Sequence, residues 1–151
     1  MWAIRHPKRI TTMDFLEMNR QVIEQFRANE GVVGGDLEGM PLALVTMTGA
    51  KTGRELCSPL VYSYDGDDVV VIASKAGAPE HPQWYYNLVA NSNVTVEVGA
   101  DKWESTAELV EGDERTRLYD AQAAVMPQFA DYAKSAAEAN RVIPVFKLVR
   151  S

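Results

Sequence analysis

The sequence predicts an α+β fold: a small barrel of about six mainly antiparallel strands, decorated by helices. Six short runs rich in β-branched and aliphatic residues predict the strands. Segments near the start, the middle and the end of the chain instead carry apolar residues at helical spacing. With 151 residues, the chain has the length of one domain, 1–151, in which we expect residues 1–10 to form a flexible N-terminal arm.

The first helix is expected over residues 14–30, where apolar side chains such as Phe15, Val22 and Phe26 form one stripe. Gly31 supplies the stop, and the glycine-rich stretch that follows is a loop. Because this stretch neither follows a strand nor opens a helix, it is not a dinucleotide-binding fingerprint.

Three strands follow, at Leu42 to Thr48, Leu56 to Tyr64 and Asp68 to Ala73. The second and third are joined by Asp65-Gly66-Asp67, and an Asp-Gly pair between two apolar runs is a strong signal for an antiparallel hairpin. The run VVVIA in the third strand is apolar without alternation, which predicts a strand that is buried on both faces.

The second half of the chain adds a short helix, a second hairpin, two more helical segments and a last strand. We expect these elements, in chain order, at residues 82–91, 94–98, 103–110, 113–127, 129–140 and 143–149.

The charge argues against a dedicated nucleic-acid-binding protein. The chain has 15 lysine and arginine residues against 21 acidic ones, a formal net charge of −6, whereas nucleic-acid binding needs a basic surface. One cysteine and two histidines provide neither an internal disulfide nor a zinc site. We therefore expect a cytoplasmic protein.

The N-terminal arm is basic, with Arg5, Lys8 and Arg9 beside Trp2 and Ile4. Such an arm is suited to weak peripheral contact with an anionic membrane, and an ordinary solvated terminus is the alternative. The arm lacks the features of a signal peptide, and no apolar run reaches the roughly 20 residues of a membrane span.

Three constellations of residues carry the chemistry. The first is the loop TGAKTGR, from Thr48 to Arg54 between the first two strands, whose glycines and cations are suited to holding a phosphate. It is not a Walker A loop, because Val45 and Ala50 stand where that motif requires glycine. An ordinary polar hairpin turn is the alternative.

The other two constellations lie near the short helix. Ala73-Ser74-Lys75 ends the buried strand, and His81 to Asn87 forms an aromatic helix start whose free N–H groups favour anions. Anion-binding groups beside an apolar stacking surface suit a flat, phosphorylated cofactor. Trp84 and Tyr85, taken singly, are also typical core residues.

Triad and metal chemistry find little support in the sequence. Cys57 and Ser58 lie in no nucleophile elbow, and His6 and His81 have no evident orienting acid. The aspartates of the turn at 65–68 are explained by their hydrogen bonds to turn backbone, so we expect no metal site there.

The segments TMTGAKTGRELCSPL, YDGDDVVVIASKAGAPEHPQWYYNL and ANSNVTVEV, in this order and at this spacing, resemble the deazaflavin-dependent nitroreductase family of actinobacteria. The resemblance covers most of the chain after the first helix. It implies a split β-barrel that uses coenzyme F420. It also implies hydride transfer from the reduced coenzyme to electron-poor acceptors such as quinones, enones and α,β-unsaturated lactones.

The resemblance also implies site residues. The cofactor would be bound by Ala50, Lys51, Thr52, Arg54, Leu56, Cys57, Ser58, Pro59, Leu60, Val61, Ile72, Ala73, Ser74, Lys75, Gln83, Trp84, Tyr85, Tyr86 and Asn87. Substrate contacts would come from Met126, Phe129 and Tyr132, with the hydroxyl of Tyr132 as the catalytic proton or hydrogen-bond donor. Met126 and Phe129 replace tyrosines of the nitroimidazole-reducing members, which argues against nitroimidazole activation specifically and leaves the reduction of other nitro compounds open.

Two alternatives remain open at this point. The same barrel could use FMN, as related split barrels do, or the protein could carry coenzyme F420 without turning it over. The residues do not indicate an oligomeric state.

Overall fold

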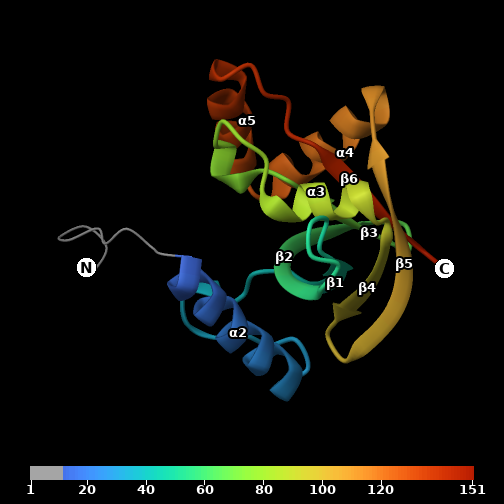
Figure 1. Ribbon diagram of the computed structural model, residues 1–151. Helices are drawn as coiled ribbons and strands as arrows, with labels where there is room; N and C mark the ends of the chain where they lie inside the picture. The colour runs from blue at the N-terminus through green and yellow to red at the C-terminus, as the bar shows by residue number, and fades with distance from the viewer. Residues whose placement is uncertain (1–11) are drawn as a thin grey trace.

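The computed structural model describes residues 12–151 (Figure 1). The predicted N-terminal arm, with its membrane contact, lies outside the described residues. Across the described range, none of the helices is long and apolar enough to cross a membrane.

Within this range six antiparallel strands close into a barrel in the order β1-β2-β3-β6-β5-β4, which confirms the predicted fold class. The strands are β1 (Leu42–Thr48), β2 (Glu55–Asp65), β3 (Asp68–Ile72), β4 (Asn93–Val98), β5 (Asp101–Val110) and β6 (Val145–Arg150). The barrel closes because β1 pairs with both β2 and β4.

Helices cover the outside of the barrel and one of its ends (Figure 1). They are α2 (Thr12–Ala28), α3 (Gln83–Ala90), α4 (Gly112–Val125) and α5 (Gln128–Glu138), joined by the short 3-10 turns η1 (Gly35–Leu37) and η2 (Lys75–Gly77). The predicted helices are confirmed, with α2 beginning and ending two residues earlier than expected.

The last strand begins later than predicted, at Val145 rather than Ile143. Pro144 has no N–H to give to a sheet, and its carbonyl accepts a hydrogen bond from the amide of Ala73 at 2.9 Å. Ile143 is 1% exposed and packs among the outer helices. Its apolar character therefore reflects packing rather than strand pairing.

Three consecutive valines explain the uninterrupted apolar run of β3. Val69 and Val71 belong to the core inside the barrel, whereas Val70 packs against residues of α4 and α5 on the outside. All three are at most 1% exposed. The predicted burial of both faces is confirmed.

The core has three parts. Inside the barrel, Leu88 of α3 joins the strand residues, so α3 closes one end of the barrel. Outside, α4 and α5 pack over β3 and β6, while α2 packs over β1 and β2 through Phe26, Leu42 and Leu44. Val61 of β2 packs against both outer clusters, so β2 lies at the boundary between them.

Candidate functional site

Three segments that the sequence analysis singled out meet at one end of the barrel. β1 ends there and β2 begins there, with Thr48 opposite Glu55, and the antiparallel β3 ends there too. Because β4 is antiparallel to β1, the helix α3 that precedes β4 lies at the same end. The topology thus brings the loop 49–54, the turn 73–81 and α3 together.

The loop 49–54 is held by its own backbone and by α3. The amide of Gly49 donates to the carbonyl of Arg54 at 2.8 Å. The amide of Ala50 donates to Oδ1 of Asn87 at 2.9 Å, and Asn87 is 3% exposed. The loop and α3 therefore form one unit, which the sequence motifs alone did not show.

The cations of this unit are exposed. Lys51 and Arg54 are exposed, and neither makes an ion pair with another residue of the described chain. Nζ of Lys75 lies 2.9 Å from Oε1 of Glu80, and this lysine lowers the pKa of the Glu80 carboxyl. Both partners are exposed, so water screens the pair strongly, and Lys75 can exchange Glu80 for another anion at small cost.

The turn that carries Lys75 packs onto α5. Lys75, Ala76 and Gly77 have φ values of 47°, 53° and 78°, the left-handed region that favours glycine. A Cβ on Gly77 would lie 2.7 Å from the carbonyl oxygen of Tyr132. Only glycine therefore lets this turn approach α5 so closely, and the approach places Lys75 beside the helix that carries Tyr132.

Arg141, which no sequence motif indicates, binds the backbone of the same turn through hydrogen bonds. Its guanidinium, on a residue only 7% exposed, donates to the carbonyls of Ser74 at 3.0 Å and Ala78 at 2.7 Å, and also to the carbonyl of Ala73. Burial lowers the pKa of this arginine. A lone arginine after a helix is usually a solvated cation, so the sequence held no signal for this role.

His81 is a positioning residue in this arrangement rather than a base. Its Nδ1 accepts a hydrogen bond from Nε of Arg141 at 2.9 Å, and its ring lies 4.3 Å from the ring of Tyr85. Burial, followed by the nearby Arg141 charge, lowers the pKa of His81. The imidazole is therefore neutral at pH 7 and links the turn to the start of α3.

Strand β2 is left partly uncovered, unlike its neighbours. Most residues of β1 and β3 are buried, whereas none of the residues of β2 is. Of its predicted cofactor residues, Leu60 packs against the inner core, whereas Cys57 and Val61 pack on the outside. Since side chains alternate along a strand, Pro59 also points outward. In the ribbon view, the strand β2, whose outward residues Cys57, Pro59 and Val61 we call its outer strip, passes between α2 and α5 (Figure 1).

The lone cysteine on this strip is a poor nucleophile. Burial raises the pKa of the Cys57 thiol, so it is protonated at neutral pH. Its Sγ lies 3.9 Å from Nη2 of Arg27, whose guanidinium pairs with Glu97 at 2.8 Å.

The aromatic start of α3 divides between core and surface. Trp84 and Tyr85 pack against the inner core, with ring centroids 5.9 and 5.7 Å from that of Phe146. Gln83 is exposed, and Tyr86 is 46% exposed. The structure thus gives Trp84 and Tyr85 a core role as well as partial exposure at the site.

The three predicted substrate residues lie close to the outer strip of β2. Met126 and Tyr132 are half-buried and pack against the same outer cluster as Val61 and Ile72. Phe129 is 6% exposed, and its carbonyl accepts a hydrogen bond from the Tyr119 hydroxyl at 2.6 Å. Phe129 is therefore part of the outer core against which Met126 and Tyr132 pack.

Comparison with known proteins gives a family match. A family model described as F420H(2)-dependent quinone reductase matches residues 17–149. A curated relative, an F420H(2)-dependent quinone reductase of Mycobacterium tuberculosis (strain ATCC 25618 / H37Rv), is 39% identical over 87 residues. That match covers 57% of this chain and 58% of the relative, so the matched stretch spans just over half of the relative's length.

Two solved structures are similar in both sequence and fold. One, described as an F420-H2 dependent reductase, is 36% identical with a TM-score of 0.65, and the match covers 72% of this chain and 93% of that one. The other, described as a domain-swapped dimer, is 32% identical with a TM-score of 0.67, covering 91% and 99%. Solved barrels at 12–13% identity, with TM-scores of about 0.5, share the fold alone.

Proposed function

Because the chain belongs to the family of F420H(2)-dependent quinone reductases, we propose that it binds coenzyme F420 and uses the reduced coenzyme to reduce electron-poor organic acceptors. Quinones are the first candidates, followed by enones and α,β-unsaturated lactones. The resemblance inferred from the sequence motifs is thereby confirmed at the level of the family.

The observation that carries the proposal is the continuity of two surfaces. The unit made by the loop 49–54, the turn 73–81 and α3 presents cations at one end of the barrel. The uncovered outer strip of β2 starts at that end, at Glu55. An elongated ligand with an anionic tail and a flat ring fits this continuous surface, because the cations would bind the tail and the outer strip of β2 would bind the ring.

The residues at the end of the barrel fit the anionic part of such a cofactor. Lys51 and Arg54 are exposed cations, and the backbone amides of Lys51 and Thr52 donate to no acceptor among the described residues. Charged donors and free amides are the groups that bind phosphate and carboxylate best. Lys75 adds a third cation at the same end of the barrel.

The outer strip of β2 fits the ring. Its backbone is paired on both sides, to β1 and to β3, so it forms a rigid floor. Val61 of β2 and Ile72 of the neighbouring strand β3 make this surface apolar. Met126 and Tyr132 pack against the same outer cluster. These side chains exclude water from the place where an acceptor would lie.

The reduced coenzyme, when bound, supplies a hydride to the acceptor. The protein residues then have three tasks: Lys51, Arg54 and Lys75 hold the anionic tail, the β2 strip holds the ring, and the α5 side chains orient the acceptor. We assign to the hydroxyl of Tyr132 the role of hydrogen-bond donor to an acceptor oxygen.

Cofactor choice is tested by titration. Trp84 is half-buried beside the proposed site, so its fluorescence should respond to a bound ring. We expect coenzyme F420 to quench it at lower concentration than FMN does. Tighter binding of FMN would overturn the assignment of the cofactor.

Turnover is tested by following the absorbance of reduced coenzyme F420 with menadione or an unsaturated lactone as acceptor. We expect loss of absorbance that depends on both protein and acceptor. Tight cofactor binding without turnover of any quinone, enone or lactone would instead favour a carrier of the coenzyme.

The basic arm, residues 1–10, is the proposed membrane contact of this otherwise acidic chain. Co-sedimentation of the full chain with anionic vesicles, compared with a chain that lacks residues 1–10, tests it. Equal sedimentation of the two chains would contradict a role for the arm.

A further inference from the structure

A groove of about 410 Å³ lies between β2 and α4, outside the residues predicted from the sequence motifs. Its lining is mainly apolar, and includes Tyr62, Leu118, Ala121 and Val125. Val125 is 78% exposed at the rim. Polar groups also line it, among them Ser63, Asp65, Arg117 and Gln122. An apolar concave surface with polar groups at fixed positions is typical of a binding site for small organic molecules.

One end of the groove adjoins the proposed acceptor position. Ser63 lines the groove and lies two residues beyond Val61, on the same face of β2. On the opposite wall, Gln122 contacts Met126 directly. The groove therefore continues the outer strip of β2 at the place where Val61 and Met126 lie.

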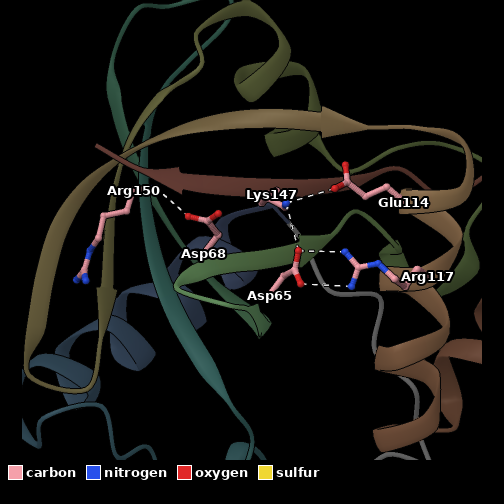
Figure 2. A network of polar contacts seen from close by, with 6 residues as sticks. All are labelled: Asp65, Asp68, Glu114, Arg117, Lys147 and Arg150. Carbon is pink, nitrogen blue, oxygen red and sulfur yellow. Dashed lines mark hydrogen bonds and ion pairs between the residues drawn. The ribbon is translucent and has the colours of Figure 1, made fainter.

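Asp65 and Arg117 line the other end of the groove, and both belong to a network of paired charges (Figure 2). Arg117 donates to both carboxylate oxygens of Asp65, at 3.3 and 3.1 Å. Lys147 lies 3.2 Å from the same carboxylate and 3.3 Å from that of Glu114. Since these four charges pair with one another, no unpaired charge at this end of the groove calls for a charged ligand.

Gln122 is the one polar side chain in the groove that is deeply buried, with 5% of its surface exposed. Its Nε2 donates to the sulfur of Met126 at 3.0 Å, and thioether sulfur is a weak acceptor. The second N–H of Nε2 donates to no acceptor among residues 12–151. Buried amide donors normally have strong acceptors, so this N–H is suited to a ligand oxygen.

We propose that the groove between β2 and α4 is a subsite for the acceptor. It holds an apolar substituent of a carbonyl compound such as an alkylated quinone, while the amide of Gln122 donates a hydrogen bond to a carbonyl oxygen. This subsite extends the acceptor position and rests on the proposed function for its role in turnover. It makes Gln122 a positioning residue that selects carbonyl acceptors with an apolar tail.

Equilibrium binding tests the subsite without turnover. The protein is saturated with oxidised coenzyme F420, and the dissociation constants of menadione and of a menadione analogue with a hexyl chain are measured by equilibrium dialysis. Each buried methylene strengthens binding by up to roughly four-fold. We therefore expect the hexyl analogue to bind at least about ten-fold more tightly than menadione.

Ala121→Trp fills the groove from an exposed helix position, and Ala124→Trp places the same side chain on an exposed position of α4 outside the groove lining. We expect the first variant to abolish the advantage of the hexyl chain and the second to retain it. Equal effects of the two variants, or an unchanged advantage in Ala121→Trp, would overturn the subsite.

Gln122→Leu tests the carbonyl contact. The wild-type protein should prefer menadione to methylnaphthalene, the corresponding hydrocarbon without carbonyls, and the variant should lose about five-fold of that preference, the usual effect of one hydrogen bond. An intact preference in a folded variant would contradict the role of Gln122.

The two proposals fail separately. Normal quinone binding with no oxidation of the reduced coenzyme would contradict the proposed function alone. Turnover of menadione with no effect of Ala121→Trp on the hexyl analogue would contradict the subsite alone.

Discussion

The amide side chain of Asn87 joins the loop between β1 and β2 to the barrel core. Its Oδ1 accepts the hydrogen bond from the amide of Ala50 at 2.9 Å, and its Nδ2 lies 3.6 Å from Sδ of Met47. One buried side chain of α3 therefore fixes the position of the loop that carries Lys51 and Arg54.

Asn87→Ala should lower both the stability and the affinity for coenzyme F420. Removing a buried partner leaves the Ala50 amide unsatisfied, which costs about 1–3 kcal/mol. The released loop should then bind the coenzyme less tightly. Denaturant unfolding and fluorescence titration check the two effects, with Val89→Ala, at an exposed position of the same helix, as the control that should change neither.

The three cations should differ in their contributions to cofactor binding. Lys51 makes no ion pair within the described residues, whereas Lys75 is paired with Glu80. We expect Lys51→Ala to weaken binding about ten-fold or more at low salt, as for loss of a charged hydrogen bond, and the loss should shrink at high salt. Lys102→Ala, an exposed lysine near the other end of the barrel, should leave binding unchanged.

Glu80→Gln frees Lys75 for the ligand. Exposed ion pairs contribute little, so binding of coenzyme F420 should tighten by roughly two- to five-fold. Weaker binding in this variant would instead assign Glu80 a direct role in holding the site together.

Gly77→Ala should disturb the site more than an ordinary glycine substitution. Gly77 and Gly66 both have positive φ, at 78° and 64°, but a Cβ on Gly66 meets nothing within 4 Å, whereas one on Gly77 meets Tyr132 and Ser135. Gly66→Ala should therefore show only the backbone strain, about 1–2 kcal/mol. Equal losses of stability and of cofactor affinity in the two variants would mean that the close approach of Gly77 to α5 contributes nothing beyond the backbone strain.

Stability should fall in mild acid because of His81. Its pKa in the folded protein is lowered from 6.5 by burial and by Arg141, so the unfolded chain binds the proton more tightly. The contribution of the neutral ring is fully present above about pH 6.5 and is lost as the pH falls through the lowered folded pKa. Urea unfolding across this range checks the slope, and His81→Asn, which keeps an acceptor for Arg141 without a titrating ring, should flatten it.

The sequence predicted the barrel because its local and global signals agree. The Asp-Gly hairpin, the alternating strands and the buried run of valines each specify a local structure that the barrel also requires. The start of β6 was misplaced because Ile143 is apolar for packing, and the apolar pattern does not distinguish packing from pairing.

The residues of the site could be predicted only where they lie within a sequence motif. The cations and the aromatic helix start lie in motifs, whereas Arg141 acts through contacts with residues 60 or more positions away, and Gln122 only lines a groove together with residues of β2. Such contacts depend on tertiary packing, and neither residue has a local signature. The resemblance assigned Phe129 to the substrate because it stands where the nitroimidazole-reducing members have a tyrosine, and its 6% exposure follows from the helical face on which it lies.

Tyr132→Phe isolates the one hydroxyl that flanks the proposed acceptor position. The ring of Tyr132 lies 5.3 Å from that of Phe129 and its backbone contacts Gly77, so the variant keeps the packing and removes only the donor. If this hydroxyl donates to the acceptor oxygen during hydride transfer, kcat for enones should fall about ten-fold or more, because a positioned proton donor contributes on the order of 100-fold. Affinity for coenzyme F420 should not change, since the hydroxyl binds the acceptor rather than the coenzyme. Steady-state kinetics with an enone, together with fluorescence titration of the coenzyme, check both expectations. A nearly unchanged kcat would assign the proton to water, which can reach a reduced acceptor once the half-buried site opens.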